Sequence, residues 1–181
     1  TSVVYDVAVR TPTIRLDVPG LTGDGPEIFL KLETLQPIGS FKIRGAYNAV
    51  RQIPPEAREQ GIWTVSAGNA AQGVALAART VGVPRSVLVM EGAPATKLAA
   101  IERLGATIVT APFDECWRTV ETHQSDRMTG RMVHPFDDEG DAANTGHRIA
   151  AIPVGGTPER AVSAHGRMRR QRNPPTTLKP D

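Results

Sequence analysis

The chain has 181 residues, of which 40% are hydrophobic and 22% charged, so it has room for one large domain or two small ones. Aromatic residues make up only 4%, and no apolar run approaches membrane-spanning length, which argues against nucleic-acid and membrane partners. The single cysteine excludes an internal disulfide, and the net charge of +2 divides into +5 over residues 144–181 and −3 over the rest.

The predicted elements begin after an irregular stretch over 1–26, which prolines and glycines interrupt. Residues 27–33 alternate apolar and polar side chains, which predicts a strand. Helices are predicted over 41–51, with Ser40 as the cap, and over 56–60. No charged-then-apolar leader precedes these elements, so we expect a cytoplasmic protein.

From residue 62 onward, predicted strands and helices alternate. The strands are 62–65, 86–90, 106–110 and 131–136, and the helices are 71–82, 95–105 and 114–128. This alternation predicts a four-stranded parallel α/β unit, covered on both faces, from Ile62 to His134. The tail, residues 144–181, lacks such a pattern, and we expect residues 157–181 to be disordered.

Lys42 lies in "GSFKIRGA", at the predicted start of a helix. The positive end of the helix dipole disfavours a cation there, so this lysine is either an ordinary surface residue or a reactive amine. The stretch Ser66–Asn69, "SAGN", follows a strand and opens the next helix. Ligands bind at that edge of parallel sheets and anions at helix N-termini, although an ordinary turn has the same residues. We expect both motifs to face one crevice.

The two motifs, in "LQPIGSFKIRGA" and "SAGNAAQGVALAA", resemble the threonine/serine dehydratase and serine racemase group of pyridoxal-phosphate enzymes. The resemblance covers roughly residues 10–141 and implies the N-terminal half of the tryptophan synthase β-like fold (fold type II), an α/β fold with three-layer parallel sheets. It implies three regions: 1–60 in the large cofactor domain, 61–140 as the small domain, and 141–181 as an atypical basic tail, predicted to be disordered.

The resemblance also implies the site. Lys42 would form the Schiff base with pyridoxal 5'-phosphate and later act as the general base, and Asn69 would contact the cofactor ring. Substrate-binding residues would be Ser66, Ala67, Gly68 and Asn69; cofactor-binding residues would be Phe41, Lys42, Asn69, Gly155 and Gly156. The pair Gly155–Gly156 in "IPVGG" is similar to the start of a phosphate-binding loop but comes early, and a coincidental pair is the favoured interpretation.

The implied reaction converts L-threonine or L-serine to a 2-oxo acid and ammonia. Full-length family members are expected to be homo-oligomers. The sequence departs from the family at Ile38 and Ala70, and after about residue 144, where we expect a truncation or a lost reading frame. Alternatives are therefore a truncated non-catalytic fragment or pseudoenzyme, a serine racemase-like activity and a basic-tailed binding module. As written, the chain is expected to be a poor catalyst.

Other candidates favour structural interpretations. Cys116 lies on a predicted amphipathic helix and is expected to pack as a small hydrophobe. The four histidines are not spaced as metal ligands, so we expect no zinc site. The acidic run 137–139 is interpreted as a solvated loop, with a bound cation as the alternative. The run "GRMRRQR" is interpreted as a solvated tail rather than a nucleic-acid contact. Missing neighbouring strands would expose an apolar surface around Phe29, Leu30 and Leu32.

Overall fold

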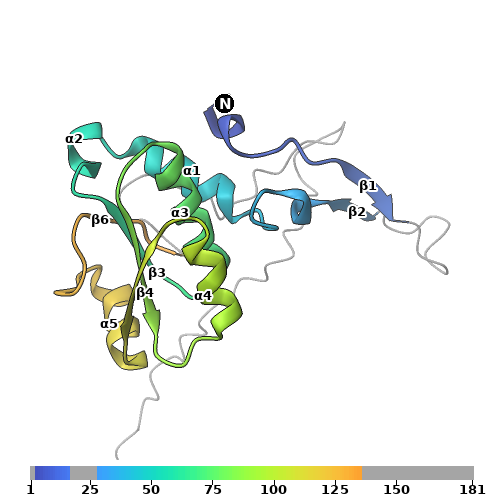
Figure 1. Cartoon of the computed structure of the whole chain (residues 1–181). Coiled ribbons are helices and arrows are strands. Elements are labelled where there is room, and N and C mark those ends of the chain that lie inside the picture. The colour runs from blue at the N-terminus through green and yellow to red at the C-terminus, as the bar shows by residue number, and fades with distance from the viewer. Residues whose placement is uncertain (1–2, 17–27, 136–181) are drawn as a thin grey trace, which may run out of the picture. The chain divides into compact units, whose positions relative to one another are not determined.

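The computed structural model describes residues 3–16 and 28–135, and its central feature is a four-stranded parallel sheet (Figure 1). The strands run in the order β5-β4-β3-β6. They are β3 (Ile62–Val65), β4 (Arg85–Met90), β5 (Thr107–Ala111) and β6 (Arg131–Met132). All three pairings are parallel, which confirms the predicted four-stranded unit.

Helices cover both faces of this sheet (Figure 1). They are α1 (Lys42–Gln52), α3 (Asn69–Thr80), α4 (Ala95–Glu102) and α5 (Phe113–Thr122). The short α2 (Pro55–Arg58) connects α1 with β3 and buries no residue. Successive strand residues point to opposite faces. Trp63 and Val65 of β3 therefore pack beside Cys116 of α5, whereas Ile62 packs with residues of α1 and α3. The result is the predicted α/β arrangement of three layers.

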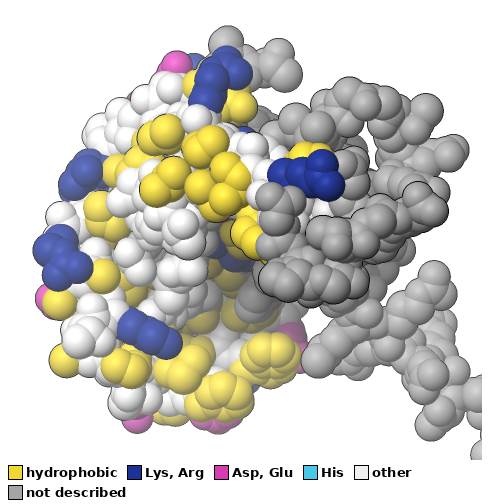
Figure 2. Space-filling view, turned by 90° about the vertical axis from the view of Figure 1, so that its right-hand side faces the viewer, with side chains coloured by type: hydrophobic (Ala, Val, Ile, Leu, Met, Phe, Trp, Pro, Cys, Tyr) yellow, Lys and Arg dark blue, Asp and Glu magenta, His cyan; other side chains and the backbone are white. Residues whose placement is uncertain are grey.

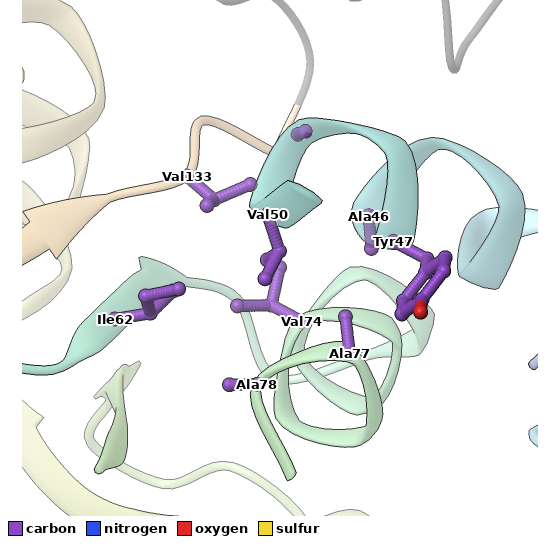
Figure 3. Close-up of a cluster of buried hydrophobic side chains, with 9 residues drawn as sticks. Ala46, Tyr47, Val50, Ile62, Val74, Ala77, Ala78 and Val133 are labelled. Atoms are coloured by element: carbon purple, nitrogen blue, oxygen red, sulfur yellow. The ribbon is translucent and has the colours of Figure 1, made fainter. Parts of the chain in front are cut away.

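The helices α1 and α3 pack directly against each other (Figure 3). Ala46, Tyr47 and Val50 recur at the three- and four-residue spacing of one helix face, and they are buried against Val74 and Ala77 of α3. Alanine side chains are short, so the two backbones approach closely at this contact. Lys42 is the first residue of α1, the helix that packs against the alanine-rich α3.

The N-terminal region contains structure that the prediction of an irregular stretch over 1–26 missed. A 3-10 helix, η1 (Val3–Asp6), precedes strand β1 (Thr13–Leu16), and β1 pairs antiparallel with β2 (Ile28–Lys31). The prediction was wrong because four residues of alternation give a weak signal, and their pairing partner lies beyond a stretch rich in glycine and proline. Strand β2 ends at Lys31, two residues before the end of the predicted strand 27–33. A second 3-10 helix, η2 (Glu33–Leu35), begins at Glu33.

Apolar side chains remain exposed on β2. Phe29 and Leu30 are 43% and 40% exposed, which confirms the expected apolar surface at these residues. Leu32 is half-buried, so the expectation was wrong there. Figure 2 shows apolar patches on one face of the molecule with single Lys and Arg side chains between them.

Several element boundaries differ from the predicted ones. Helix α5 ends at Thr122 instead of residue 128, because His123 adopts the left-handed conformation (φ 60°) that commonly terminates helices. Strand β6 has two residues instead of six. Helix α3 begins at Asn69, two residues earlier than predicted. Helix α4 ends at Glu102, ahead of Gly105, whose positive φ of 77° favours glycine.

The predicted division at residue 60 stays a prediction, and α1 before it packs against α3 after it. The predicted disorder of the tail and the acidic run 137–139 lie outside the described residues. Within the described part of the chain, no helix has the length and apolar character needed to cross a membrane.

Candidate active site

Lys42 is held at the start of α1 by a sharp turn. Gly39 adopts a positive φ of 66°, where a side chain would be strained, and its N–H donates to the Gln36 carbonyl at 2.7 Å. The Ser40 hydroxyl then accepts a hydrogen bond from the Lys42 N–H at 3.3 Å. The prediction of Ser40 as the N-cap was wrong by one residue: Phe41 occupies the N-cap position without a side-chain cap, and Ser40 precedes it.

The Lys42 amine lies in a half-buried position. Its Nζ donates to the Pro135 carbonyl at 3.3 Å and lies 5.6 Å from the centre of the Phe41 ring. Burial lowers the pKa of Lys42 below the ordinary lysine value, because removal from water disfavours the charged form. A lowered pKa increases the fraction of neutral amine near neutral pH, and only the neutral amine is a nucleophile.

The stretch Ser66–Asn69 connects the carboxyl end of β3 with α3. The Ser66 hydroxyl accepts a hydrogen bond from the Gly68 N–H at 3.1 Å, which closes a tight turn. Gly68 occupies the N-cap position. Because glycine has no side chain, the first N–H groups of α3 receive no side-chain hydrogen bond from this position. Asn69 is exposed in the first turn of the helix instead of in the predicted loop.

The starts of α1 and α3 lie close together. A Cβ atom on Gly73, one turn into α3, would lie only 3.2 Å from the Lys42 carbonyl oxygen and 3.2 Å from the Ala46 Cβ. Pro135, just beyond β6, contacts the Lys42 amine at the same time. The Lys42 backbone therefore lies against α3 one turn from its start, while its amine contacts the segment just after β6. That the two motifs face one crevice stays a prediction.

A polar network anchors the first turn of α1 from the other side. Arg44 donates to both carboxylate oxygens of Glu33, at 2.8 and 2.9 Å, and to the Val9 carbonyl at 2.9 Å. The Thr11 hydroxyl and the Gln36 amide donate to the same carboxylate at 2.6 and 3.1 Å. Burial alone would raise the pKa of Glu33, but the hydrogen bonds from Arg44 and Thr11 and the Arg44 charge hold it below its usual value.

Sequence reasoning missed this network and two further contacts to Lys42. Available signals were Arg44, two residues after the lysine, and Gly73, a glycine inside a helix that usually indicates close packing. The Pro135 carbonyl gave no signal, because a backbone acceptor is not identified by its side chain. Gly155 and Gly156, the candidate phosphate loop, lie outside the described residues.

Two other sequence candidates have defined surroundings. Cys116 is 4% exposed, as expected for a packed side chain, and burial raises the pKa of its thiol. The rings of His123 and His134 lie 4.6 Å apart, and the His134 Nε2 lies 3.1 Å from the Val120 carbonyl oxygen. The described residues contain no cluster of three or more side chains suited to holding a metal ion.

The described groups match the chemistry of pyridoxal phosphate and an amino acid. An aldehyde needs a nucleophilic amine, and Lys42 supplies a half-buried one whose pKa is lowered. A substrate carboxylate needs hydrogen-bond donors. The backbone N–H groups at the N-terminus of α3 are such donors, and the N-cap residue Gly68 has no side chain that would occupy them. Among the described residues, Lys42 therefore fits the aldehyde of the cofactor implied by the resemblance.

Comparison with known proteins identifies the family to which this chain belongs. The model of the family described as "pyridoxal-phosphate dependent enzyme" matches residues 4–166, and the chain belongs to this family. An L-threonine ammonia-lyase of Thermotoga maritima is 38% identical over 170 residues, which cover 86% of this chain and 41% of that protein. A chloroplastic threonine dehydratase of Solanum lycopersicum is 46% identical over 140 residues, covering 76% of this chain and 23% of that protein.

Solved structures give the same family resemblance. Threonine deaminase isoform 2 from Solanum lycopersicum matches with a TM-score of 0.61 and 35% identity, over 75% of this chain and 39% of that chain. Serine racemase from Dictyostelium discoideum matches with a TM-score of 0.62 and 32% identity, over 76% and 44%. The chain thus spans about two fifths of the Thermotoga relative and of these structures. These matches confirm the resemblance to the dehydratase and serine racemase group, and the fold class.

Proposed function

We propose that this protein is a pyridoxal-phosphate-dependent ammonia-lyase that deaminates L-threonine or L-serine, with Lys42 as the residue that attaches the cofactor. The observation that carries the proposal is the Lys42 amine, which is half-buried, has a lowered pKa and donates to the Pro135 carbonyl at 3.3 Å. The threonine ammonia-lyase and threonine dehydratase relatives support the reaction class.

In this proposal, Lys42 at the start of α1 holds the cofactor, and Ser66–Asn69 at the start of α3 bind the substrate. When bound, the cofactor supplies an electron sink for negative charge at the substrate Cα. Lys42 would hold the cofactor at its aldehyde carbon through Nζ, and the free Lys42 amine would accept the substrate Cα proton as a general base. The β-hydroxyl would leave as water, and the released unsaturated amino acid would be hydrolysed by water to a 2-oxo acid and ammonia, the products of the proposed reaction.

The turn at Ser66–Asn69 is proposed to bind the substrate carboxylate. Backbone N–H groups at a helix N-terminus bind anions, and the partial positive charge of α3 adds to the attraction. Asn69, which has both a donor and an acceptor, is proposed as the contact to the cofactor ring, with Phe41 beside Lys42 as part of the cofactor site. The phosphate role of Gly155 and Gly156, the cytoplasmic location and a homo-oligomeric state stay predictions.

Covalent labelling tests the assignment of Lys42. The 181-residue chain is incubated with equimolar pyridoxal phosphate and reduced with borohydride, and its peptides are mapped by mass spectrometry. We expect the pyridoxyl label on Lys42 and its loss in Lys42→Ala. Lys97 is exposed on α4 and reports non-specific surface labelling. A label concentrated on Lys31, Lys97 or Lys179, with Lys42 unmodified, would refute the assignment.

Product analysis separates the lyase from its alternatives. Formation of 2-oxobutyrate from L-threonine is measured against the Lys42→Ala variant as the blank. Formation of D-serine from L-serine is measured in parallel, because serine racemases are among the structural neighbours. Turnover to 2-oxobutyrate supports the proposal, predominant D-serine would replace it with a racemase, and labelling without turnover would indicate a non-catalytic role.

A further inference from the structure

The carboxylate of Glu33 is the centre of a network that joins three segments of the chain. It accepts hydrogen bonds from Arg44 of α1, from Thr11 before β1 and from Gln36 after η2. Side-chain exposure is only 13% for Glu33 and 22% for Arg44, so water screens this pair less than a surface ion pair. Both carboxylate oxygens contact the guanidinium, and this bidentate geometry fixes orientation as well as distance.

Gln36 extends the network to the N-terminal segment. It is 4% exposed, and its amide accepts from the Val9 N–H and donates to the Val9 carbonyl, both at 2.9 Å. Arg44 donates to the same Val9 carbonyl. Segment 9–11 is therefore bound to the chain on both sides of the turn that carries Lys42.

The network joins the residues that precede the Gly39 turn to those that follow it. Glu33 and Gln36 precede the turn at Gly39, and Arg44 follows Lys42 in the first turn of α1. A helix start is ordinarily prone to fray, because its first N–H groups lack partners within the helix. Here Arg44 binds the first turn to a carboxylate on the preceding segment, so the chain is fixed before and after Lys42.

We propose that the Glu33–Arg44 pair, with Gln36, positions the Lys42 amine against the Pro135 carbonyl and keeps it half-buried. The relevance of this positioning to catalysis rests on the proposed function of Lys42, whereas the positioning itself is a property of the chain alone. Glu33 and Arg44 are positioning residues, because they act on the amine through the backbone of α1. Glu33 and Arg44 bind each other, whereas the Lys42 amine donates to the Pro135 carbonyl.

The test measures the titration of Lys42 without cofactor. The 181-residue chain is reductively methylated with formaldehyde at a series of pH values, and peptide mapping gives the rate at each lysine. The midpoint of the Lys42 profile reports how far its amine is removed from water. We expect the midpoint to rise by at least about half a pH unit in Arg44→Met, because a frayed first turn returns the amine to solvent. Lys97 is the internal reference in each sample.

A second variant separates position from charge. Removing the Arg44 cation alone would raise the Lys42 midpoint by electrostatics, whereas removing the Glu33 anion alone would lower it. Loss of positioning raises the midpoint in both cases. We therefore expect Glu33→Met and Arg44→Met to shift the midpoint in the same upward direction, and Arg44→Lys, which retains one charged hydrogen bond, to restore part of the shift.

Matched destabilisation provides the final control. Val89→Ala removes a buried side chain from β4, among neighbours that belong to the sheet, α3 and α4. We expect it to lower the melting temperature without moving the Lys42 midpoint. Opposite shifts in Glu33→Met and Arg44→Met, an unchanged midpoint, or an equal shift in Val89→Ala would overturn the proposal. Because formaldehyde replaces the cofactor, these outcomes do not depend on whether Lys42 attaches pyridoxal phosphate.

Discussion

The parallel sheet and the β1–β2 pair differ in how they bury apolar side chains. Every residue of β3 is buried, because α5 packs on one face of the sheet and α1 and α3 on the other. In the β1–β2 pair, Ile14 and Leu30 lie opposite each other and are 44% and 40% exposed. An isolated two-stranded sheet is marginally stable in water, so this pair depends on contacts made elsewhere in the chain.

The polar contacts near this pair lie at the segment that carries Lys42. The network around Glu33 and Arg44 connects the chain just before β1 with the start of α1. The layered sheet thus supplies a rigid support for α3 through buried apolar area. The N-terminal region supplies orientation through hydrogen bonds. Lys42 lies where these two kinds of stabilisation meet.

The largest expected difference between the two regions follows from truncating one leucine in each. Leu88 is fully buried in β4 beside Trp63, whereas Leu30 is 40% exposed on β2. Leu88→Ala should lower the free energy of unfolding by about 2–5 kcal/mol, because it removes buried surface and leaves a cavity. Leu30→Ala should lower it by less than roughly 1 kcal/mol.

Urea unfolding followed by circular dichroism measures both changes. Equal losses in the two variants would contradict the comparison, because they would mean that Leu30 is covered in solution. A change in the urea slope as well as in the midpoint would indicate that the variant alters the surface exposed on unfolding.

An intermediate loss of unfolding free energy is expected from Gly73→Ala, at the contact between α3 and the first turns of α1. A methyl group on Gly73 would lie 3.2 Å from both the Ala46 Cβ and the Lys42 carbonyl oxygen. Gly73→Ala should therefore cost about 1–3 kcal/mol of unfolding free energy through overpacking, in spite of the better helix propensity of alanine.

The double variant Gly73→Ala/Ala46→Gly divides this cost between the two contacts. It removes the clash between methyl groups and leaves the close approach to the Lys42 carbonyl, so we expect partial recovery measured by the same urea titration. Full recovery would show that the Lys42 backbone moves freely, and no loss in Gly73→Ala would show that α1 and α3 are not held at this distance.

The two regions also differ in how well the sequence predicted them. The alternation of short apolar runs with helical periods predicted all four strands of the parallel sheet and their order of appearance, because each element carries its own local signal. Strand β1 was missed, because four residues of alternation gain their meaning only from pairing with β2. The early end of α5 at His123 was missed as well, since a left-handed histidine gives no signal in composition.

The candidate site shows the same division. Lys42 and Ser66–Asn69 were predicted from motifs, because reactive and turn-forming side chains are identified by residue type. The Pro135 carbonyl and the Glu33–Arg44 pair were not predicted, because they depend on which distant segments the fold brings together. Residue type thus indicates which groups can react, whereas tertiary contacts determine how they are held.

The smallest expected effect compares two buried threonines, one in each region. Thr64 in β3 is fully buried, and its hydroxyl has no hydrogen-bond partner among the described residues. Thr11 is 5% exposed, and its hydroxyl donates to Glu33 at 2.6 Å. Valine has nearly the same shape as threonine, so Thr→Val at each position tests the hydroxyl alone.

Thr64→Val should raise the free energy of unfolding by about 1 kcal/mol, because it removes a polar group that loses its water on folding and gains nothing in return. Thr11→Val should lower it by about 1–2 kcal/mol, because it deprives a partly buried carboxylate of a donor. Urea unfolding of both variants gives the two signs directly. A loss of stability in Thr64→Val would mean that its hydroxyl finds a partner in solution. The parallel sheet would then also contain a polar interaction, and the contrast between an apolar support and a polar anchor for Lys42 would fail at this position.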